Sequence, residues 1–278
     1  MDPELAAEIL GSEPLLRLGV LLGMLGLMAA WEGLRPRRPA TTRRRRWTAN
    51  LALVAIDAAA VRLLLPAATV GIALFAENRG WGLLPLLDLP TWLALAASLI
   101  LLDLALYLQH VATHKIPLLW RLHRVHHSDL AIDVTTAVRF HPIEILLSLA
   151  YKGAVVVMLG APAVAVLLFE LLLNGSALFN HGNVRLPPRL DAILRRLWVT
   201  PDMHRIHHSV ERDETDSNYG TCLSLWDRLF GTYRAQPRAG HEGLVIGLAE
   251  WRDDRDQRLW NLLAQPFAHR APRGGARP

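Results

Sequence analysis

Long apolar runs separated by short polar stretches fill the first two thirds of the chain. Residues 14–31 and 91–109 each contain one charged residue, Arg17 and Asp103, and residues 50–76 form another long apolar run. One crossing of a bilayer needs about 20 mostly apolar residues in a helix. The pattern therefore predicts an all-α integral membrane bundle.

The apolar run at residues 142–180 is too long for one crossing. Gly160-Ala161-Pro162 divides it into halves of about 18 residues, which predicts a helical hairpin. Whether this hairpin crosses the bilayer fully is left open. His141 and His181 would emerge from its two ends on the same side of the membrane.

Arginines concentrate in one segment between apolar runs. Arginine occupies positions 35, 37, 38 and 43–46, and two prolines keep the preceding helix from continuing. Because positively charged loops stay in the cytoplasm, residues 14–31 should run inward, 50–76 outward and 91–109 inward. A basic patch that binds phospholipid headgroups is a compatible alternative.

Composition supports a membrane protein and narrows its chemistry. Apolar residues make up 52% of the chain, the mean hydropathy is +0.22 and the net charge is +5. The arginines adjoin apolar segments, which favours membrane orientation and argues against nucleic-acid binding. The single cysteine, Cys222, excludes an intrachain disulfide framework and cysteine-based metal sites.

Histidines form three short motifs on the predicted cytoplasmic side. They are H-V-A-T-H at 110–114, H-R-V-H-H at 123–127 and H-R-I-H-H at 204–208. Histidines four apart on a helix point the same way, whereas adjacent ones diverge by about 100°. In each H-x-x-H-H motif the first and last histidines should therefore share one ion, and the middle one should reach another. Eight imidazoles suit two ions, whereas a closed structural zinc site needs only four ligands.

These motifs resemble the fatty acid hydroxylase and sterol desaturase superfamily of membrane di-iron oxygenases. Further resemblance lies in R-F-H-P-I-E at 139–144, F-N-H-G-N-V at 179–184 and the segment 218–233. The resemblance implies two iron ions, dioxygen as co-substrate and a cytoplasmic, histidine-rich helical cap that holds the metals. Zinc is expected as a substitute in purified protein. The implied ligands are His110, His114, His123, His126, His127, His141, His181, His204, His207 and His208. Ala177 stands where some members have one more histidine.

Three other polar residues are candidates for the catalytic site. Asp103, Tyr107, His110 and His114 recur at helical spacing along one face, and a carboxylate in a membrane segment is a functional candidate. Asp103 is expected either to accept a hydrogen bond from a ligand imidazole or to make a polar contact between helices, and the sequence favours neither. Asn218 is expected to position water or a ligand imidazole.

The resemblance implies hydroxylation of a lipid C–H bond or oxidative cleavage of an ether lipid. A sterol or fatty-acyl desaturase is the first alternative, and a histidine-rich metal transporter is a remote one. The implied partners are a membrane lipid and a separate electron donor, either ferredoxin or a cytochrome b5-like protein with its reductase, and a homo-oligomer is left open. The composition is typical of a bacterial protein, hence of the inner membrane. The division expected is a membrane region with its arginine-rich loop (1–89), a catalytic domain (90–235) and a cytoplasmic tail (236–278).

Overall fold

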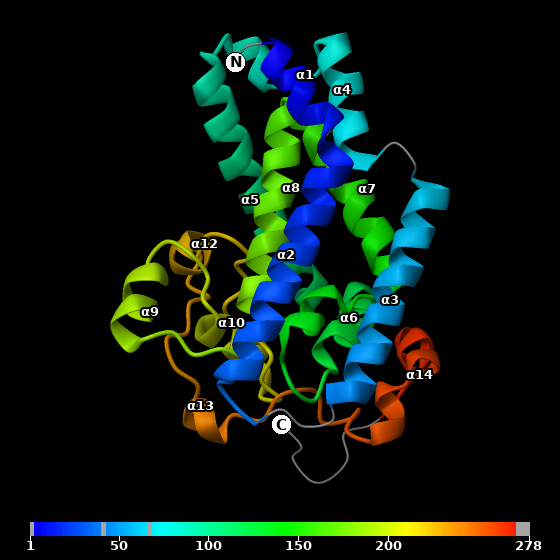
Figure 1. Cartoon of the computed structure of the whole chain (residues 1–278), viewed down its shortest axis with the longest axis vertical. Coiled ribbons are helices and arrows are strands. Elements are labelled where there is room, and N and C mark those ends of the chain that lie inside the picture. Colours follow the sequence, from blue (N-terminus) through cyan, green and yellow to red (C-terminus); the bar gives the residue numbers. More distant parts are fainter. Residues whose placement is uncertain (1–2, 40–42, 66–67, 271–278) are drawn as a thin grey trace.

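The computed structural model describes residues 3–39, 43–65 and 68–270, and within these ranges the chain is helical with no β-strand. Figure 1 shows long helices packed side by side in the upper part and short helices and loops gathered below them. The bundle consists of α1 (Pro3–Gly11), α2 (Glu13–Leu34), α3 (Arg43–Leu64), α4 (Ala68–Arg79), α5 (Thr91–Lys115), α7 (Pro142–Leu159) and α8 (Ala163–Asn180), with η1 (Leu84–Leu87) between α4 and α5.

Five segments are long and apolar enough to cross a membrane. They are Glu13–Leu34, Arg45–Arg79, Thr91–Lys115, Pro142–Leu159 and Ala163–Asn180. Large apolar side chains on these helices remain exposed, among them Leu22 (55%), Leu63 (79%) and Ile100 (47%). Such a belt is unfavourable in water and favourable against lipid. The predicted spans at residues 14–31, 91–109 and the two halves of 142–180 are confirmed as helices, and the first two of these helices extend beyond their apolar runs.

The predicted single helix at residues 50–76 is wrong in one respect. The structure has two helices there, α3 and α4, and α3 ends at Leu64, just before Pro66 in the sequence. Proline disfavours the helical conformation of the residue before it and lacks an amide hydrogen. Residues 66 and 67 lie outside the described part of the chain.

The predicted hairpin is confirmed as α7 and α8, two helices of 18 residues each. Gly160 ends α7 in the left-handed conformation (φ 64°), where its amide bonds to Val156 and Val157 carbonyls. A Cβ at this position would lie 2.4 Å from the carbonyl oxygen of Trp81. Only glycine fits this turn, because it tolerates positive φ and leaves room for the neighbouring loop.

A buried carboxylate on α8 ties the long helices together. Glu170 is 3% exposed and accepts hydrogen bonds from Lys152 Nζ (2.9 Å) and Thr69 Oγ1 (2.6 Å), and it also pairs with Arg17. These partners come from α7, α4 and α2. Because an isolated charge in a membrane is costly, this pairing makes the carboxylate compatible with its position.

The lower part of the molecule is built from shorter elements. They are α6 (Pro117–His127), η2 (Val134–Val138), α9 (Pro188–Leu194), α10 (Pro201–His207), α11 (Arg212–Thr215), α12 (Leu225–Leu229), α13 (Gly240–Gly243), η3 (Asp254–Gln257), α14 (Leu259–Ala264) and η4 (Gln265–Phe267). The predicted tail is ordered up to residue 270: Arg121 Nε donates to the Pro266 carbonyl (2.6 Å), and Gln257 Nε2 donates to the Ser128 carbonyl (3.0 Å). The sequence also predicts disorder after Pro266. Within that segment, residues 267–270 are described, and Arg270 Nη1 donates to Asp256 Oδ1 (2.7 Å), whereas residues 271–278 lie outside the described part.

Candidate metal centre

Nine histidines converge in two groups where the long helices meet the short ones. The first group is His110, His114, His123, His127 and His207, and the second is His126, His181, His204 and His208. Within each group the candidate ligand atoms all lie within 4.8 Å of one another. The predicted sorting is confirmed: the outer histidines of each H-x-x-H-H motif share a group, and the middle one belongs to the other.

Acceptors outside the ring fix the orientation of three imidazoles in the first group. Each Nδ1 atom lies 2.6–2.7 Å from an oxygen atom that accepts a hydrogen bond. His110 donates to the Tyr219 carbonyl, His207 to the Ser217 carbonyl and His123 to Glu144 Oε1. A carbonyl or carboxylate oxygen only accepts, so each Nδ1 carries the hydrogen. The Nε2 atom of each neutral ring is then left with a lone pair.

These lone pairs face one another. His110 Nε2 lies 3.0 Å from His207 Nε2 and 3.2 Å from His123 Nε2. Two unprotonated nitrogens cannot hydrogen-bond to each other, but both can bind the same cation. Histidines that bind a metal commonly donate their other ring N–H to a carbonyl or carboxylate, as these rings do. Nitrogens about 2.1 Å from one ion at right angles are about 3 Å apart, which fits these separations.

The second group has the same construction with fewer anchors. His181 Nδ1 donates to the Ala177 carbonyl (2.7 Å), and His181 Nε2 lies 3.1 Å from His126 Nε2 and 3.0 Å from His204 Nε2. Neither nitrogen of the buried His208 has a hydrogen-bond partner among the described residues. A buried imidazole without a partner is costly unless a ligand completes it. The residues of both groups therefore fit bound metal ions.

Burial prepares these imidazoles to act as ligands. It lowers the pKa of His207 to about 3 and of His181 to about 4, despite their bonds to backbone carbonyls. Burial and the neighbouring imidazoles also hold the pKa of His126, His127, His204 and His208 well below its usual range. Metals bind neutral imidazole, so no proton has to leave at neutral pH.

The metal-free protein is expected to lose stability as the pH falls from about 7 to about 5. Unfolded histidines protonate near pH 6.5, whereas folded His181 and His207 stay neutral in this window, so the unfolded state binds more protons. The free energy of unfolding should fall by about 2 kcal/mol for each of the two residues by about pH 5. Carboxylates titrate mainly below this window. The melting temperature of apoprotein in detergent measures the effect, and equal values at both pH values would contradict it.

His141 departs from the expected ligand set. It lies outside both groups, its Nδ1 accepts a hydrogen bond from the Ile143 amide (3.2 Å), and its Nε2 lies 3.2 Å from the Leu263 carbonyl oxygen. The residue is the N-cap of α7. It therefore serves the start of the helical hairpin, because a capping side chain satisfies an amide that the helix itself leaves free.

The three polar candidates contact protein groups and do not line the cavity beside the histidines. Asp103 accepts hydrogen bonds from Trp226 Nε1 (2.8 Å) and the Leu223 amide (3.2 Å), which corrects the expectation that a ligand imidazole is its partner. The Tyr107 hydroxyl is bonded to Thr232 Oγ1 (2.8 Å).

Asn218 has a backbone role. It adopts a left-handed conformation (φ 52°), its Nδ2 donates to the Met203 carbonyl (3.0 Å), and its Oδ1 accepts from the Arg234 amide (2.8 Å). The carbonyl of the preceding residue, Ser217, holds His207. Asn218 thus fixes the loop that orients this imidazole and does not contact it through its side chain.

Glu144 was missed by the sequence reasoning. Its carboxylate holds the Nδ1 hydrogen of His123 at 2.6 Å, and the residue is 8% exposed. A carboxylate that accepts from a ligand imidazole fixes the ring and makes it a stronger ligand. The signal in the sequence is the R-F-H-P-I-E motif at 139–144, which contains Glu144 as well as His141.

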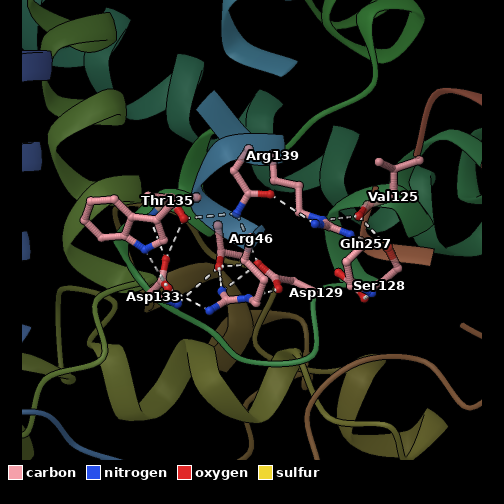
Figure 2. Close-up of polar contacts among 11 residues, drawn as sticks. Arg46, Val125, Ser128, Asp129, Asp133, Thr135, Arg139 and Gln257 are labelled. Carbon is pink, nitrogen blue, oxygen red and sulfur yellow. Dashed lines mark hydrogen bonds and ion pairs between the residues drawn. The ribbon is translucent and has the colours of Figure 1, made fainter. Parts of the chain in front are cut away.

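A buried ionic network anchors the other side of α6, as Figure 2 shows. Arg46 donates from Nη1 to Asp133 (2.7 Å) and from Nη2 to Asp129 (2.8 Å). Arg139 donates from Nε to the Val125 carbonyl (2.8 Å) and from Nη2 to Ser128 Oγ (2.9 Å). The network joins α3 to the end of α6, the helix that carries three of the histidines.

Arg139 also reaches the metal centre through its backbone. Its carbonyl oxygen lies 3.3 Å from His126 Nδ1, while its guanidinium is fully buried and donates to Asn50 Oδ1 (3.0 Å). Burial lowers the pKa of Arg139 to about 10, against the charge of Asp129. The arginine remains charged at neutral pH and holds its segment beside the second group.

A cavity of about 230 Å³ opens onto both groups of histidines between α5, α7 and α8. Five of its lining residues belong to the two groups: His110, His123, His126, His181 and His204. Apolar side chains form much of the remaining wall, among them Leu106, Phe140, Ile145 and Leu173. A small molecule in this cavity would lie beside histidines of both groups.

Several known proteins are similar to this chain. The family model for fatty acid hydroxylase matches residues 95–232. Ornithine lipid hydroxylase OlsE of Rhizobium tropici is 34% identical over 175 residues, which cover 62% of this chain and 50% of that protein. Alkylglycerol monooxygenase of Homo sapiens is 28% identical, covering 52% of this chain and 31% of the relative. The cholesterol 25-hydroxylase-like protein of Danio rerio is 31% identical, covering 50% and 54%.

The chain thus spans about half the length, or less, of these three relatives, and no solved structure matches it significantly. The matched region contains both H-x-x-H-H motifs, the H-x-x-x-H motif and the hairpin. All nine grouped histidines fall inside it. Through residues 95–232 the chain belongs to the fatty acid hydroxylase and sterol desaturase superfamily.

Proposed function

We propose that this protein is a membrane-bound oxygenase that hydroxylates a C–H bond of a lipid, with two iron ions held by the nine grouped histidines. The observation that carries the proposal is the cavity that faces both groups from between membrane helices. The relatives are hydroxylases and monooxygenases named for lipid substrates. His141 is left out of the proposed ligand set because its nitrogens are engaged elsewhere.

When bound, iron supplies the activation of dioxygen for C–H oxidation, and the chain's own residues do the rest. Backbone carbonyls and Glu144 hold the ligand rings by their Nδ1 hydrogens, so every anchored Nε2 faces inward. The apolar wall between α5, α7 and α8 excludes water and places a carbon chain against the two groups. This positioning selects which C–H bond lies nearest the oxidant.

A lipid would enter sideways, from the bilayer. A second hollow of about 360 Å³ shares Gln109, Thr113 and Glu144 with the cavity at the histidines. Its other walls include Leu108 and Leu147, which are 47% and 48% exposed on the membrane-facing helices. This apolar opening supports a substrate that arrives from the membrane rather than from water.

Hydroxylation inserts one oxygen atom of dioxygen into a C–H bond and reduces the other to water with two electrons and two protons. We propose that a separate protein, a ferredoxin or a cytochrome b5-like protein with its reductase, supplies the electrons. The arginine-rich connection between α2 and α3 lies at the histidine end, where Arg38 bonds to the Leu244 carbonyl (2.7 Å). By the positive-inside rule this supports a cytoplasmic centre, here in a bacterial inner membrane.

The division into residues 1–89, 90–235 and 236–278 is likewise proposed. The family match at 95–232 falls within the second part. The parts are joined closely, because Arg46 of the first binds Asp129 of the second, and Gln257 of the third donates to the Ser128 carbonyl of the second. The first part is therefore expected to stabilise the catalytic part as well as anchor it.

Mass spectrometry of whole-cell lipids tests the proposed function. Cells that express the protein should gain lipids heavier by one oxygen atom, and cells that express His126→Ala should not. The same lipids should carry label when the cells grow under ¹⁸O₂, because the inserted oxygen comes from dioxygen. A loss of two hydrogens would identify a desaturase instead, and an unchanged lipid profile would refute lipid oxidation.

A further inference from the structure

A separate cavity of about 360 Å³ lies in the lower part of the molecule, away from the hairpin. It is bounded by the end of α2, the connection to α3, the loop after α6, α10 and the segment after α13. Its charged lining consists of Arg38, Arg46, Arg205 and Arg252 with Glu32 and Asp133. None of these residues belongs to the two histidine groups.

The acidic side chains of this lining already have partners. Asp133 pairs with Arg46 and also accepts from Trp47 Nε1 (3.1 Å). Glu32 Oε1 accepts from the amides of Val134 (2.7 Å) and Asn183 (2.8 Å). Neither carboxylate is bonded to Arg38, Arg205 or Arg252 in the described contacts. Three guanidinium groups thus give the cavity an excess of positive charge.

Arg205 is the least satisfied of the three. It is 1% exposed, and its Nη1 has no hydrogen-bond partner among the described residues. Its Nη2 donates to the Gly182 carbonyl at 3.3 Å, and its Nε lies 3.5 Å from Asp202 Oδ1. The charge of Asp202 favours the guanidinium at this place, whereas the like charges of Arg37 and Arg38 oppose it. A buried guanidinium with a free donor and like charges nearby is stabilised by an anion.

We propose that this cavity is a binding site for a phosphate group, held by Arg205 at its base and by Arg38 and Arg252 at its rim. Guanidinium groups bind phosphate oxygens through paired hydrogen bonds and hold them better than a point charge does. The cavity is larger than a bare phosphate and falls within the usual range for small-molecule sites of about 300–1,000 Å³. The phosphate is therefore carried on a small ester, which is either the headgroup of a membrane phospholipid or a soluble metabolite.

Arg252 offers the cleanest variant, because it is exposed and its one described hydrogen bond runs from Nη1 to the Ile246 carbonyl (3.0 Å). Calorimetric titration of the full-length protein in detergent with inorganic phosphate, at constant ionic strength, should show saturable binding. Arg252→Gln and Arg205→Lys should each weaken it by about tenfold or more. Arg189→Gln, which removes an exposed arginine of α9 outside the cavity, should leave it unchanged.

Native mass spectrometry of the same proteins distinguishes the two sources. Phosphatidic acid or phosphatidylglycerol retained by the wild type and lost from Arg252→Gln assigns the site to a lipid headgroup. Phosphate binding without a retained lipid assigns it to a soluble ester. The proposal is overturned if phosphate gives no saturable binding, or if Arg252→Gln binds it as tightly as the wild type. Because no readout depends on oxygenase activity, this result is independent of the proposed function.

Discussion

Changing His207 to alanine is expected to abolish oxygenation of the lipid and to lower the metal content of the purified protein. His207 Nε2 faces His110 Nε2 at 3.0 Å, and the Ser217 carbonyl fixes its ring. Its loss leaves the first group with four histidines and an open ligand position. Removing a residue that only hydrogen-bonds to a metal ligand lowers metal affinity or activity by about 10–100-fold. Removing the ligand itself should therefore reduce activity by more than about 100-fold.

Metal content per protein chain, measured by elemental analysis, separates loss of metal from loss of fold. The wild type should carry close to two metal ions, as nine histidines in two groups imply. His241→Ala is the matched control, because His241 lies outside both groups and only approaches Asp202 Oδ2 at 3.9 Å. If His207→Ala keeps both metals and full activity, the proposed ligand set is refuted.

Changing Asp129 to alanine is expected to cost about 3–5 kcal/mol of stability, as removal of one partner from a buried ion pair does. Asp129 is fully buried and receives hydrogen bonds from Arg46, Asn50 and Thr136. Although burial raises the pKa of Asp129, the charges of Arg46 and Arg139 outweigh it and hold that pKa well below its usual range. Without this carboxylate, Arg46 keeps Asp133 as its ion-pair partner among the described residues, and Arg139 loses the attraction of the Asp129 charge (Figure 2).

The exposed pair of Arg45 and Asp254 provides a control, because Arg45 lies next to Arg46 on α3 while Asp254 lies in η3. Its side chains are 72% and 67% exposed, so Asp254→Ala should change the stability by less than about 1 kcal/mol. Melting temperatures of both variants in the same detergent, with the metal sites loaded, give the comparison. Equal melting temperatures for Asp129→Ala and Asp254→Ala would show that the network does not stabilise the fold.

Helical periodicity was enough to sort most of the histidines. In an α-helix the residues i and i+4 share a face, while i+3 and i+4 point in different directions, and this places His123 with His127 and separates His126. The same local rule located the hairpin, because Gly160 and Pro162 interrupt an apolar run of twice the length of a span. Features that depend on neighbours in the chain were therefore accessible from sequence.

Contacts between distant segments were not accessible in this way. His141 matched a family position, yet the structure turns it to the Ile143 amide and the Leu263 carbonyl, 122 residues away. Asp103 shares a helical face with His110 and His114, but its carboxylate accepts a hydrogen bond from Trp226 Nε1, a residue far away in the sequence. Glu144 is the partner of His123 because α7 packs beside α6, and the sequence does not predict that packing.

By itself, the sequence determined the helical bundle, the hairpin and the division of the H-x-x-H-H histidines between two groups. These follow from hydrophobic length, helix-breaking residues and the period of the α-helix, which all act within a few turns. The tertiary structure alone decided which carbonyl or carboxylate orients each imidazole, that His141 is a helix cap, and that three arginines from separate segments surround one cavity. Such pairings depend on how distant segments pack, and no local pattern of residues encodes that packing directly.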